Sequence, residues 1–222
     1  MPDSGIKDFF DVANTMEGAL SLGVGEPDFP TPEHVREAAI ASIKKGDTKY
    51  TDNRGTVELR AAAADYLTKF DLHYDKQDEI LITMGASEGI DLALRTLVNP
   101  GEEVLVAEPS YVSYIPCIEL CGGVPVSLKL RAENKFRLTR EQLEEKITEK
   151  SKVLLISYPN NPTGAIMEKE DLEAIAEVVK EHDLFVITDE IYAELTYGKK
   201  HVSIASLPGM YERCVVLNGF SK

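Results

Sequence analysis

The stretch Phe185-Val186-Ile187-Thr188-Asp189-Glu190-Ile191-Tyr192 joins an apolar run directly to charged and aromatic residues. A short run such as Phe185–Thr188 is typical of a strand that is buried on both faces. A carboxylate at the end of such a strand costs several kcal/mol unless it is paired, so we expect Asp189 to face a cation or a strong hydrogen-bond donor. The stretch therefore predicts a buried strand with a functional residue at its carboxyl end.

The same alternation of apolar runs and amphipathic helices extends along the chain. The predicted strands are Ile80–Thr83, Val104–Ala107, Val124–Leu128, Val153–Ser157, Phe185–Thr188 and Val215–Leu217. The predicted helices are Pro32–Lys45, Val57–Lys69, Glu88–Leu97, Arg140–Ile147 and Lys169–Glu181. Thr31 is expected to cap the first helix, with Pro32 as its first residue, and Thr139–Gln142 fits a capping box. This alternation predicts an α/β fold, a three-layer αβα arrangement with a mainly parallel sheet and ligands beyond the carboxyl ends of its strands.

Composition and charge exclude several classes of function. The 222 residues include 24 basic and 38 acidic side chains, a net charge of −14, and the longest basic runs are pairs of lysines, so nucleic acid is not expected as a partner. No apolar stretch approaches the roughly 18 residues of a membrane span. The first residues, Met1-Pro2-Asp3-Ser4, lack the basic and apolar parts of a secretory signal, which predicts a cytoplasmic protein.

The cysteines do not predict a metal site. Cys117 and Cys121 are spaced four residues apart on a predicted helix, and no second pair of Cys or His residues completes a zinc site with them. Together with Cys214, they are predicted to be reduced thiols in the core.

Unusual residues follow five of the predicted strands. These segments are Met84-Gly85-Ala86-Ser87-Glu88, Glu108-Pro109-Ser110-Tyr111, Tyr158-Pro159-Asn160-Asn161-Pro162-Thr163-Gly164, Asp189-Glu190-Ile191-Tyr192 and Asn218-Gly219-Phe220-Ser221-Lys222. Amides at a helix start suit a phosphate, an aromatic ring suits a stacked ligand, and a turn bounded by prolines can hold an amide fixed. Taken alone, each segment also has a structural interpretation, as a tight connection, a surface-packing ring or a rigid strand end.

One ligand accounts for all five segments together. A phosphorylated ring with a protonatable nitrogen and an aldehyde needs a phosphate cradle, a stacking ring, a carboxylate for the nitrogen, a donor for the ring oxygen and a lysine for the aldehyde. Pyridoxal 5′-phosphate, held as a lysine Schiff base with an aspartate at the ring nitrogen, has these requirements. The sequence therefore predicts this cofactor.

At this point the sequence resembles the class I/II aminotransferases, which are pyridoxal-phosphate enzymes of fold type I. The matching segments are Gly23-Val24-Gly25-Glu26-Pro27-Asp28-Phe29, Lys49-Tyr50-Thr51 with Gly55 and Glu58-Leu59-Arg60, Gly85-Ala86-Ser87, Pro109-Ser110-Tyr111, Asn160-Asn161-Pro162-Thr163-Gly164, Asp189-Glu190-Ile191-Tyr192 and Gly219-Phe220-Ser221-Lys222. Their order and spacing both fit the family. The chain is similar in particular to prokaryotic aspartate and aromatic aminotransferases.

The resemblance implies catalytic roles for Lys222, Asp189 and Tyr192, and a binding role beside them for Asn161. Lys222 is expected to form the Schiff base with the cofactor and then to move the proton on the substrate. Asp189 is expected to keep the ring nitrogen protonated, which makes the ring an electron sink. Tyr192 and Asn161 are expected to hydrogen-bond the ring oxygen, and Asn161 is also expected at the substrate carboxylate.

The resemblance also implies binding roles. Gly85, Ala86 and Ser87 are expected to cradle the phosphate, with Ser221 as a further cofactor contact, and Tyr111 is expected to stack on the ring. Gly25 is expected to lie against the substrate, where the missing side chain allows close approach. Tyr50 is expected to reach the phosphate of a neighbouring subunit, which makes a homodimer with shared active sites part of the prediction.

The chain departs from the family in two ways. The position three before the lysine, often a hydroxyl residue that helps to bind phosphate, is Gly219. Family members typically run to nearly twice this length, so we expect residues 1–45 to be an N-terminal arm with part of the small domain. Residues 46–222 are expected to form the cofactor-binding large domain, truncated at the cofactor lysine, with the small domain largely missing.

The resemblance implies transfer of an amino group from an L-amino acid to a 2-oxo acid by a ping-pong route. A carbon–sulfur lyase or a decarboxylase on the same fold shares the cofactor contacts and stays open as an alternative. A non-catalytic relative that only binds the cofactor is less consistent with the presence of both Lys222 and Asp189. The identity of the amino acid is not predicted.

Overall fold

A computed structural model describes residues 5–18, 23, 25 and 27–222 of the chain. The chain divides into two compact units, Met1–Lys49 with Ser221, and Tyr50–Phe220 with Lys222. Each unit is described by itself below. Val24 and Glu26 of the first matching segment, and the residues before Gly5, lie outside the described residues.

The described residues of the first unit form two helices, α1 (Gly5–Thr15) and α2 (Glu33–Lys45). Pro32, with φ −52° and ψ 143°, is the residue that precedes α2, and no side chain caps the helix. The prediction that Thr31 caps this helix is therefore wrong, because Pro32 takes the capping position and leaves Thr31 one residue too far from the first amides. At the other end Gly46 adopts a left-handed conformation, with φ 85°, and closes the helix through its amide.

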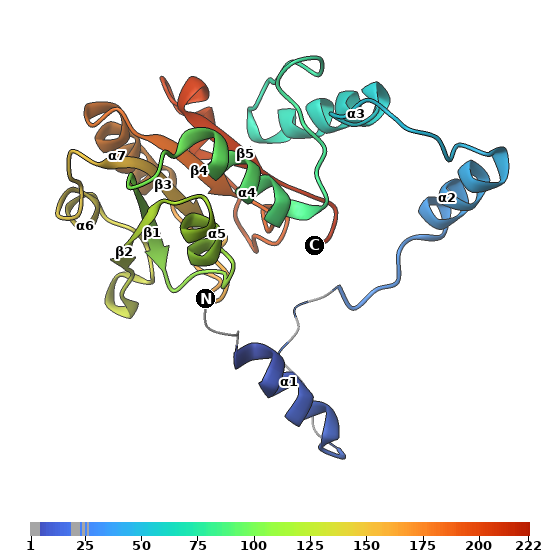
Figure 1. Ribbon diagram of the computed structural model, residues 1–222, viewed down its shortest axis with the longest axis horizontal. Coiled ribbons are helices and arrows are strands. Elements are labelled where there is room, and N and C mark those ends of the chain that lie inside the picture. The colour runs from blue at the N-terminus through green and yellow to red at the C-terminus, as the bar shows by residue number, and fades with distance from the viewer. Residues whose placement is uncertain (1–4, 19–22, 24, 26) are drawn as a thin grey trace. The chain divides into compact units, whose positions relative to one another are not determined.

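The second unit is built on a sheet of five parallel strands in the order β2-β1-β3-β4-β5 (Figure 1). The strands are β1 (Glu103–Glu108), β2 (Val124–Lys129), β3 (Ser151–Ser157), β4 (Phe185–Asp189) and β5 (Cys214–Leu217). Five of the six predicted strands are thus confirmed. The sheet is entirely parallel, as the alternation of strands and helices predicts.

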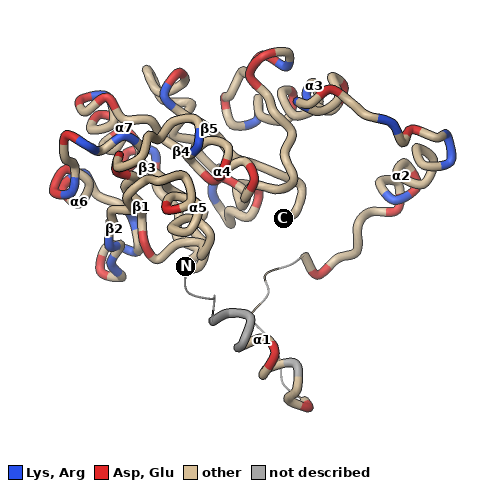
Figure 2. The backbone as a smooth tube through the Cα atoms, viewed as in Figure 1, with Lys and Arg blue, Asp and Glu red and all other residues tan. Residues whose placement is uncertain are grey.

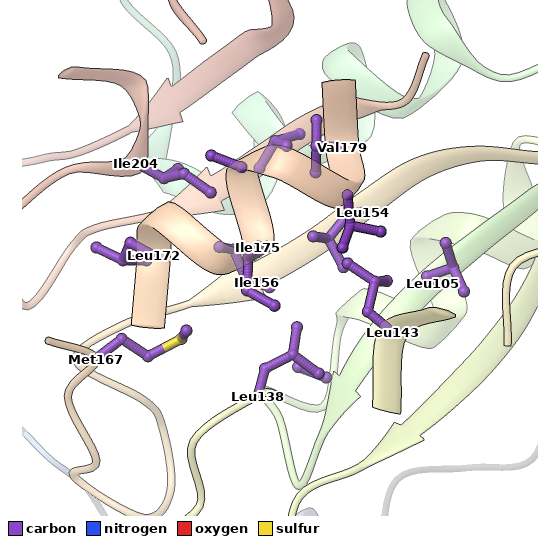
Figure 3. Packing of buried hydrophobic residues seen from close by; sticks show 14 of the residues in the cluster. Leu105, Leu138, Leu143, Leu154, Ile156, Met167, Leu172, Ile175, Val179 and Ile204 are labelled. Atoms are coloured by element: carbon purple, nitrogen blue, oxygen red, sulfur yellow. The ribbon is translucent and has the colours of Figure 1, made fainter. Parts of the chain in front are cut away.

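Alternate residues of β1 and β3 pack against helices on opposite faces of the sheet. Leu105 and Leu154 point to the face covered by α6 (Arg140–Glu144) and α7 (Lys169–Glu181), and Figure 3 shows them packed with side chains of these helices. Their neighbours Val104 and Val153 pack on the other face with α4 (Gly85–Leu97) and α5 (Tyr114–Leu120). The predicted three-layer αβα arrangement is therefore confirmed.

The predicted strand Ile80–Thr83 is wrong. In the part of the chain that the structure describes, this segment pairs with no strand, and the Ile82 amide donates instead to the carbonyl of Arg54 in a loop, at 3.0 Å. An apolar, β-branched run specifies a strand only where a neighbouring backbone is available to pair with it.

The helix predictions hold with shifted ends. The helix predicted over Val57–Lys69 is α3 (Val57–Leu67), followed by a 3₁₀ turn (Thr68–Phe70). The helix predicted from Glu88 begins three residues earlier as α4, α6 is shorter than predicted, and α7 has its predicted bounds. The Thr139 capping box is confirmed, with both of its reciprocal hydrogen bonds. Further 3₁₀ turns lie at Ala132–Asn134, Ile204–Ser206 and Tyr211–Arg213.

Other surface and composition predictions can be compared with the structure. Figure 2 shows basic residues interspersed with acidic ones along the chain. All three cysteines are free and half-buried, and the described residues contain no cluster of three metal-binding side chains. None of the described helices is both long and apolar enough to cross a membrane.

Candidate active site

The register of the parallel sheet brings three strand ends side by side. Ser157 at the end of β3 pairs with Asp189 at the end of β4, and Asp189 pairs with Leu217 at the end of β5. Because parallel strands end at the same edge, the segments that follow these three residues leave the sheet together. They carry three of the five groups of site residues expected from the sequence.

Asp189 lies at the centre of this edge and is 4% exposed. Its Oδ2 accepts a hydrogen bond from the Tyr114 hydroxyl at 2.7 Å, and its Oδ1 accepts one from the Ile191 amide at 3.1 Å. Burial raises the pKa of Asp189, the two hydrogen bonds oppose that rise, and the charge of Glu190 adds to it. Both donors are neutral, so a cation bound here would gain a strong interaction with the carboxylate. The strong donor expected for Asp189 is Tyr114, which sequence reasoning did not select.

Tyr192 connects the other groups of the site to Asp189. Burial raises the pKa of Tyr192, the Asp189 charge raises it further, a hydrogen bond with the Asn161 side chain lowers it, and Tyr111 raises it slightly. The Lys222 Nζ lies 5.9 Å from the centre of the Tyr192 ring. The structure thus brings together five residues that were singled out from different parts of the sequence.

The turn after β3 distinguishes its two asparagines. Asn160 is buried and builds the turn, because its Oδ1 accepts hydrogen bonds from the Thr163 hydroxyl at 2.8 Å and the Thr163 amide at 3.2 Å. The Asn160 Nδ2 donates to the carbonyl of Pro109 at 3.3 Å and so ties this turn to the segment that precedes Tyr111. Asn161, in contrast, lies close enough to Tyr192 to lower the pKa of the Tyr192 hydroxyl.

Gly85, Ala86 and Ser87 form the first turn of α4, where the helix dipole and the amides that a helix start leaves unpaired favour an anion, although the Gly85 amide itself donates to the Thr83 carbonyl at 3.0 Å. Gly85 has φ +78°, a conformation that glycine adopts at little cost. Gly89, one turn later, packs directly on β5, because a Cβ there would lie 2.8 Å from Leu217 Cδ2. The expected phosphate cradle is thus attached to the strand that leads to Lys222.

The remaining expected site residues are placed differently. Gly25 and Ser221 belong to the first unit, so their roles stay predictions. Tyr50 is fully exposed. At Gly219 a Cβ would lie 2.9 Å from Ile191 Cδ1, so a hydroxyl-bearing side chain would be crowded in this chain. Ile191 Cδ1 is the flexible end of its side chain and can move aside, so this contact does not explain the departure from the family at position 219.

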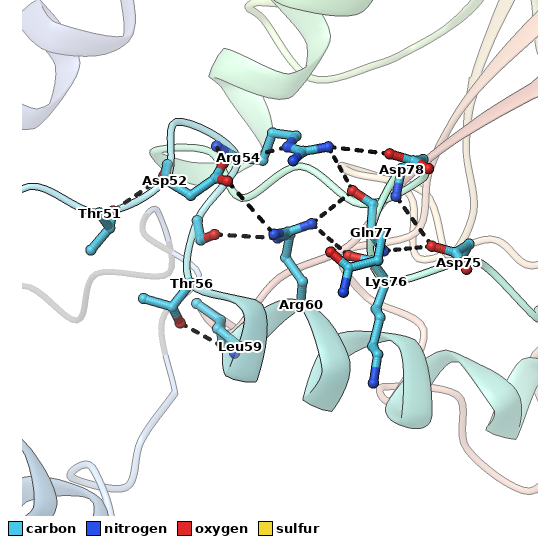
Figure 4. Close-up of polar contacts among 11 residues, drawn as sticks. Thr51, Asp52, Arg54, Thr56, Leu59, Arg60, Asp75, Lys76, Gln77 and Asp78 are labelled. Carbon is cyan, nitrogen blue, oxygen red and sulfur yellow. Dashed lines mark hydrogen bonds and ion pairs between the residues drawn. The ribbon is translucent and has the colours of Figure 1, made fainter.

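Arg60 has no predicted role, and it anchors the loop that follows Tyr50 (Figure 4). Its buried guanidinium donates to the carbonyls of Lys76 at 2.6 Å, Gln77 at 2.8 Å and Gly55 at 3.2 Å. A Cβ at Gly55 would lie 2.5 Å from Ile82 Cγ1, so the loop also depends on a glycine. These residues of the matching motif hold backbone in place.

A second buried polar cluster begins at Glu190, next to Asp189. Its carboxylate accepts hydrogen bonds from the Ser203 hydroxyl at 2.7 Å and the Thr188 hydroxyl at 3.1 Å, and it lies 2.8 Å from His201 Nε2. Glu190 is 1% exposed. The cluster fixes the backbone on both sides of Asp189, and no spacing in the sequence connects Glu190 with His201.

Comparison with known proteins assigns the family. The family model described as aminotransferase class I and II matches residues 17–222. The chain belongs to this family. This aminotransferase-family chain is 52% identical over 220 residues to a putative aminotransferase of Bacillus subtilis, and 47% identical over 221 residues to aromatic-amino-acid aminotransferase 2 of Thermococcus litoralis. Each alignment covers 99% of this chain and 57% of the relative.

A solved structure agrees with the family assignment. The aspartate aminotransferase of Thermus thermophilus, determined with maleate, superposes with a TM-score of 0.94 at 35% identity. The superposition covers 100% of this chain and 59% of the other. The chain therefore spans somewhat more than half the length of the aminotransferases that it matches.

Proposed function

We propose that the full-length protein is a pyridoxal 5′-phosphate-dependent aminotransferase that moves an amino group from an L-amino acid to a 2-oxo acid by a ping-pong route. The observation that carries this proposal is the Asp189 carboxylate, buried at a strand end, held by two neutral donors and adjoined by Tyr192. Such a carboxylate is suited to a ligand with a protonated ring nitrogen.

The described residues of the site fit this cofactor. The first turn of α4 offers backbone amides for the phosphate, and the Tyr192 and Asn161 side chains offer donors for a ring oxygen. Tyr111 offers an aromatic face, and Lys222 offers an amine beside the Tyr192 ring. When bound, pyridoxal phosphate supplies an electrophilic carbonyl and an electron-withdrawing ring.

Each protein group then has a defined task. Lys222 anchors the cofactor and afterwards moves a proton at the substrate α-carbon, for which its amine must be neutral. Asp189 holds the proton on the ring nitrogen. Tyr192 and Asn161 orient the ring through its oxygen, and Tyr111 covers one face and keeps water from it.

The assembly is also part of the proposal. A homodimer with shared active sites is supported by Tyr50, which is fully exposed on a loop that Arg60 anchors and is therefore available to a second subunit. In the proposed domain division, residues 1–45 are an arm with part of the small domain and residues 46–222 are the cofactor domain. A cytoplasmic location is consistent with three free cysteines.

The names of the relatives favour amino transfer over the lyase or decarboxylase alternatives. Aminotransferases that act on aspartate and on aromatic amino acids occur among them, so the donor amino acid remains outside the proposal. Substrate specificity is therefore a question for the full-length protein.

The test uses the full-length protein loaded with pyridoxal phosphate and given one amino acid without a 2-oxo acid. An aminotransferase releases one equivalent of 2-oxo acid per site and then stops until a 2-oxo acid is added. Continuous release of ammonia with a 2-oxo acid would contradict the proposal and favour a lyase. Lys222→Ala, reduced with borohydride in parallel, should lose the covalent cofactor adduct that the unaltered protein keeps.

A further inference from the structure

Tyr114 is a buried residue of the candidate site to which the predicted chemistry gives no task. It is the first residue of α5 and is 1% exposed. Its hydroxyl donates to Asp189 Oδ2 at 2.7 Å, and its ring packs edge-on against Tyr111, with ring centres 5.7 Å apart at 78°. Tyr114 therefore contacts both the carboxylate and the aromatic ring that are proposed to hold the cofactor.

The geometry around Asp189 fixes the carboxylate from two sides. The Ile191 amide holds Oδ1 and the Tyr114 hydroxyl holds Oδ2, so rotation of the carboxylate would break one bond or the other. The other titratable groups that act on Asp189 are Glu190, next in the chain, and Tyr192, in the turn that follows. Burial and the Glu190 charge oppose ionisation of Asp189, and the two hydrogen bonds favour it.

We propose that Tyr114 is a positioning residue that acts on the cofactor through Asp189, holding the carboxylate in place and keeping the shared proton on the ring nitrogen. This inference rests on the proposed function. A proton between a ring nitrogen and a carboxylate moves toward the nitrogen when another donor stabilises the ionised carboxylate. A hydrogen bond to a charged group changes such an equilibrium by about 10- to 100-fold.

The removal of one oxygen atom tests this proposal. In the full-length protein loaded with pyridoxal phosphate that carries ¹⁵N in the ring, the nitrogen chemical shift reports directly whether the nitrogen is protonated. Tyr114→Phe keeps the ring and its packing on Tyr111 and removes the donor. We expect the signal to move from the protonated position toward that of a neutral ring, with a weaker affinity for the cofactor.

Tyr158→Phe is the matched control. Tyr158 is also a buried tyrosine, 5% exposed, and its hydroxyl accepts from the Leu138 amide at 3.2 Å and donates to the Phe136 carbonyl at 3.1 Å. Tyr158→Phe removes a buried hydroxyl that makes no hydrogen bond with Asp189, so the chemical shift of the ring nitrogen should not change. If Tyr114→Phe and Tyr158→Phe lower the melting temperature by similar amounts, a difference between their nitrogen signals does not come from a difference in stability.

A second background isolates the path through Asp189. In Asp189→Asn, the further change Tyr114→Phe should leave the nitrogen signal unaltered, because the ionised carboxylate is already gone. An unmoved signal in Tyr114→Phe alone, or an equal movement in Tyr158→Phe, would overturn this inference and leave the proposed function intact. If the unaltered full-length protein does not bind the cofactor, this inference and the proposed function are both wrong.

Discussion

Replacing Arg60 with methionine removes a buried guanidinium while keeping much of its apolar volume. The side chain is 1% exposed, and its loss leaves the carbonyls of Gly55 and Lys76 without this donor and the carbonyl of Gln77 with Arg54 alone. Each unsatisfied buried acceptor costs about 1–3 kcal/mol, and breaking a buried charged network typically costs about 3–5 kcal/mol in total. We expect the free energy of unfolding to fall by about 3–5 kcal/mol, because the space that the guanidinium fills is closed to water.

Thermal unfolding of the full-length protein measures this effect. At about 2–4 °C per kcal/mol for a domain of this size, the melting temperature should fall by about 6–20 °C. Arg54→Met is the matched control, since Arg54 also donates to the Gln77 carbonyl, at 2.7 Å, but its side chain is 45% exposed. That variant should lose about 1 kcal/mol or less. Equal losses in the two variants would refute the reasoning that burial decides the cost.

Three further predictions concern the site itself. Lys222→Ala should abolish the borohydride-stable mass adduct and reduce turnover to background, and an adduct that persists would mean that another amine holds the cofactor. Burial raises the pKa of Asp189, so the folded apoprotein binds this proton more tightly than the unfolded chain does. Its stabilising contribution is therefore complete below about pH 4, where the unfolded carboxyl titrates, and is lost as the pH rises through the folded pKa. The melting temperature of apo Asp189→Asn, measured relative to that of the unaltered apoprotein, should rise as the pH increases from about 4 to 7. A difference in melting temperature that stays constant over this range would contradict the predicted sign. Glu190→Ala should lower the free energy of unfolding by about 3–5 kcal/mol, because it leaves His201 and two hydroxyls without their buried partner; denaturant unfolding that changes by less than about 1 kcal/mol would disprove it.

Local patterns allowed much of the fold to be predicted. The capping box at Thr139 and the bounds of α7 depend on residues within a few positions of one another, and both are as expected. The run Ile80–Thr83 looks locally like a strand, but a strand requires a neighbour, and only the fold decides whether one is present. The cap and the helix depend on residues that are near in the sequence, whereas a strand depends on a partner strand that can be distant in the sequence.

The site was predictable to the extent that each residue follows a strand. Asp189 and Asn161 could be selected because strand ends are visible in the sequence, and parallel pairing brings such ends together. Tyr114 could not be selected, because its partner Asp189 lies 75 residues away and a lone buried tyrosine has no sequence signature. The same holds for Arg60, whose partners are backbone carbonyls that any residue type provides.

The contact between Gly89 and Leu217 has a consequence for how such a site can change. Because Gly89 has no side chain, the backbone of α4 lies against the Leu217 side chain of β5, and this contact sets the spacing between the helix amides and the chain leading to Lys222. A bound molecule that joins the two must therefore have a fixed length, whatever residues line the rest of the site. Loops around this edge of the sheet can vary to accept different amino acids, while the distance between an anion bound at the start of α4 and the Lys222 amine stays constant.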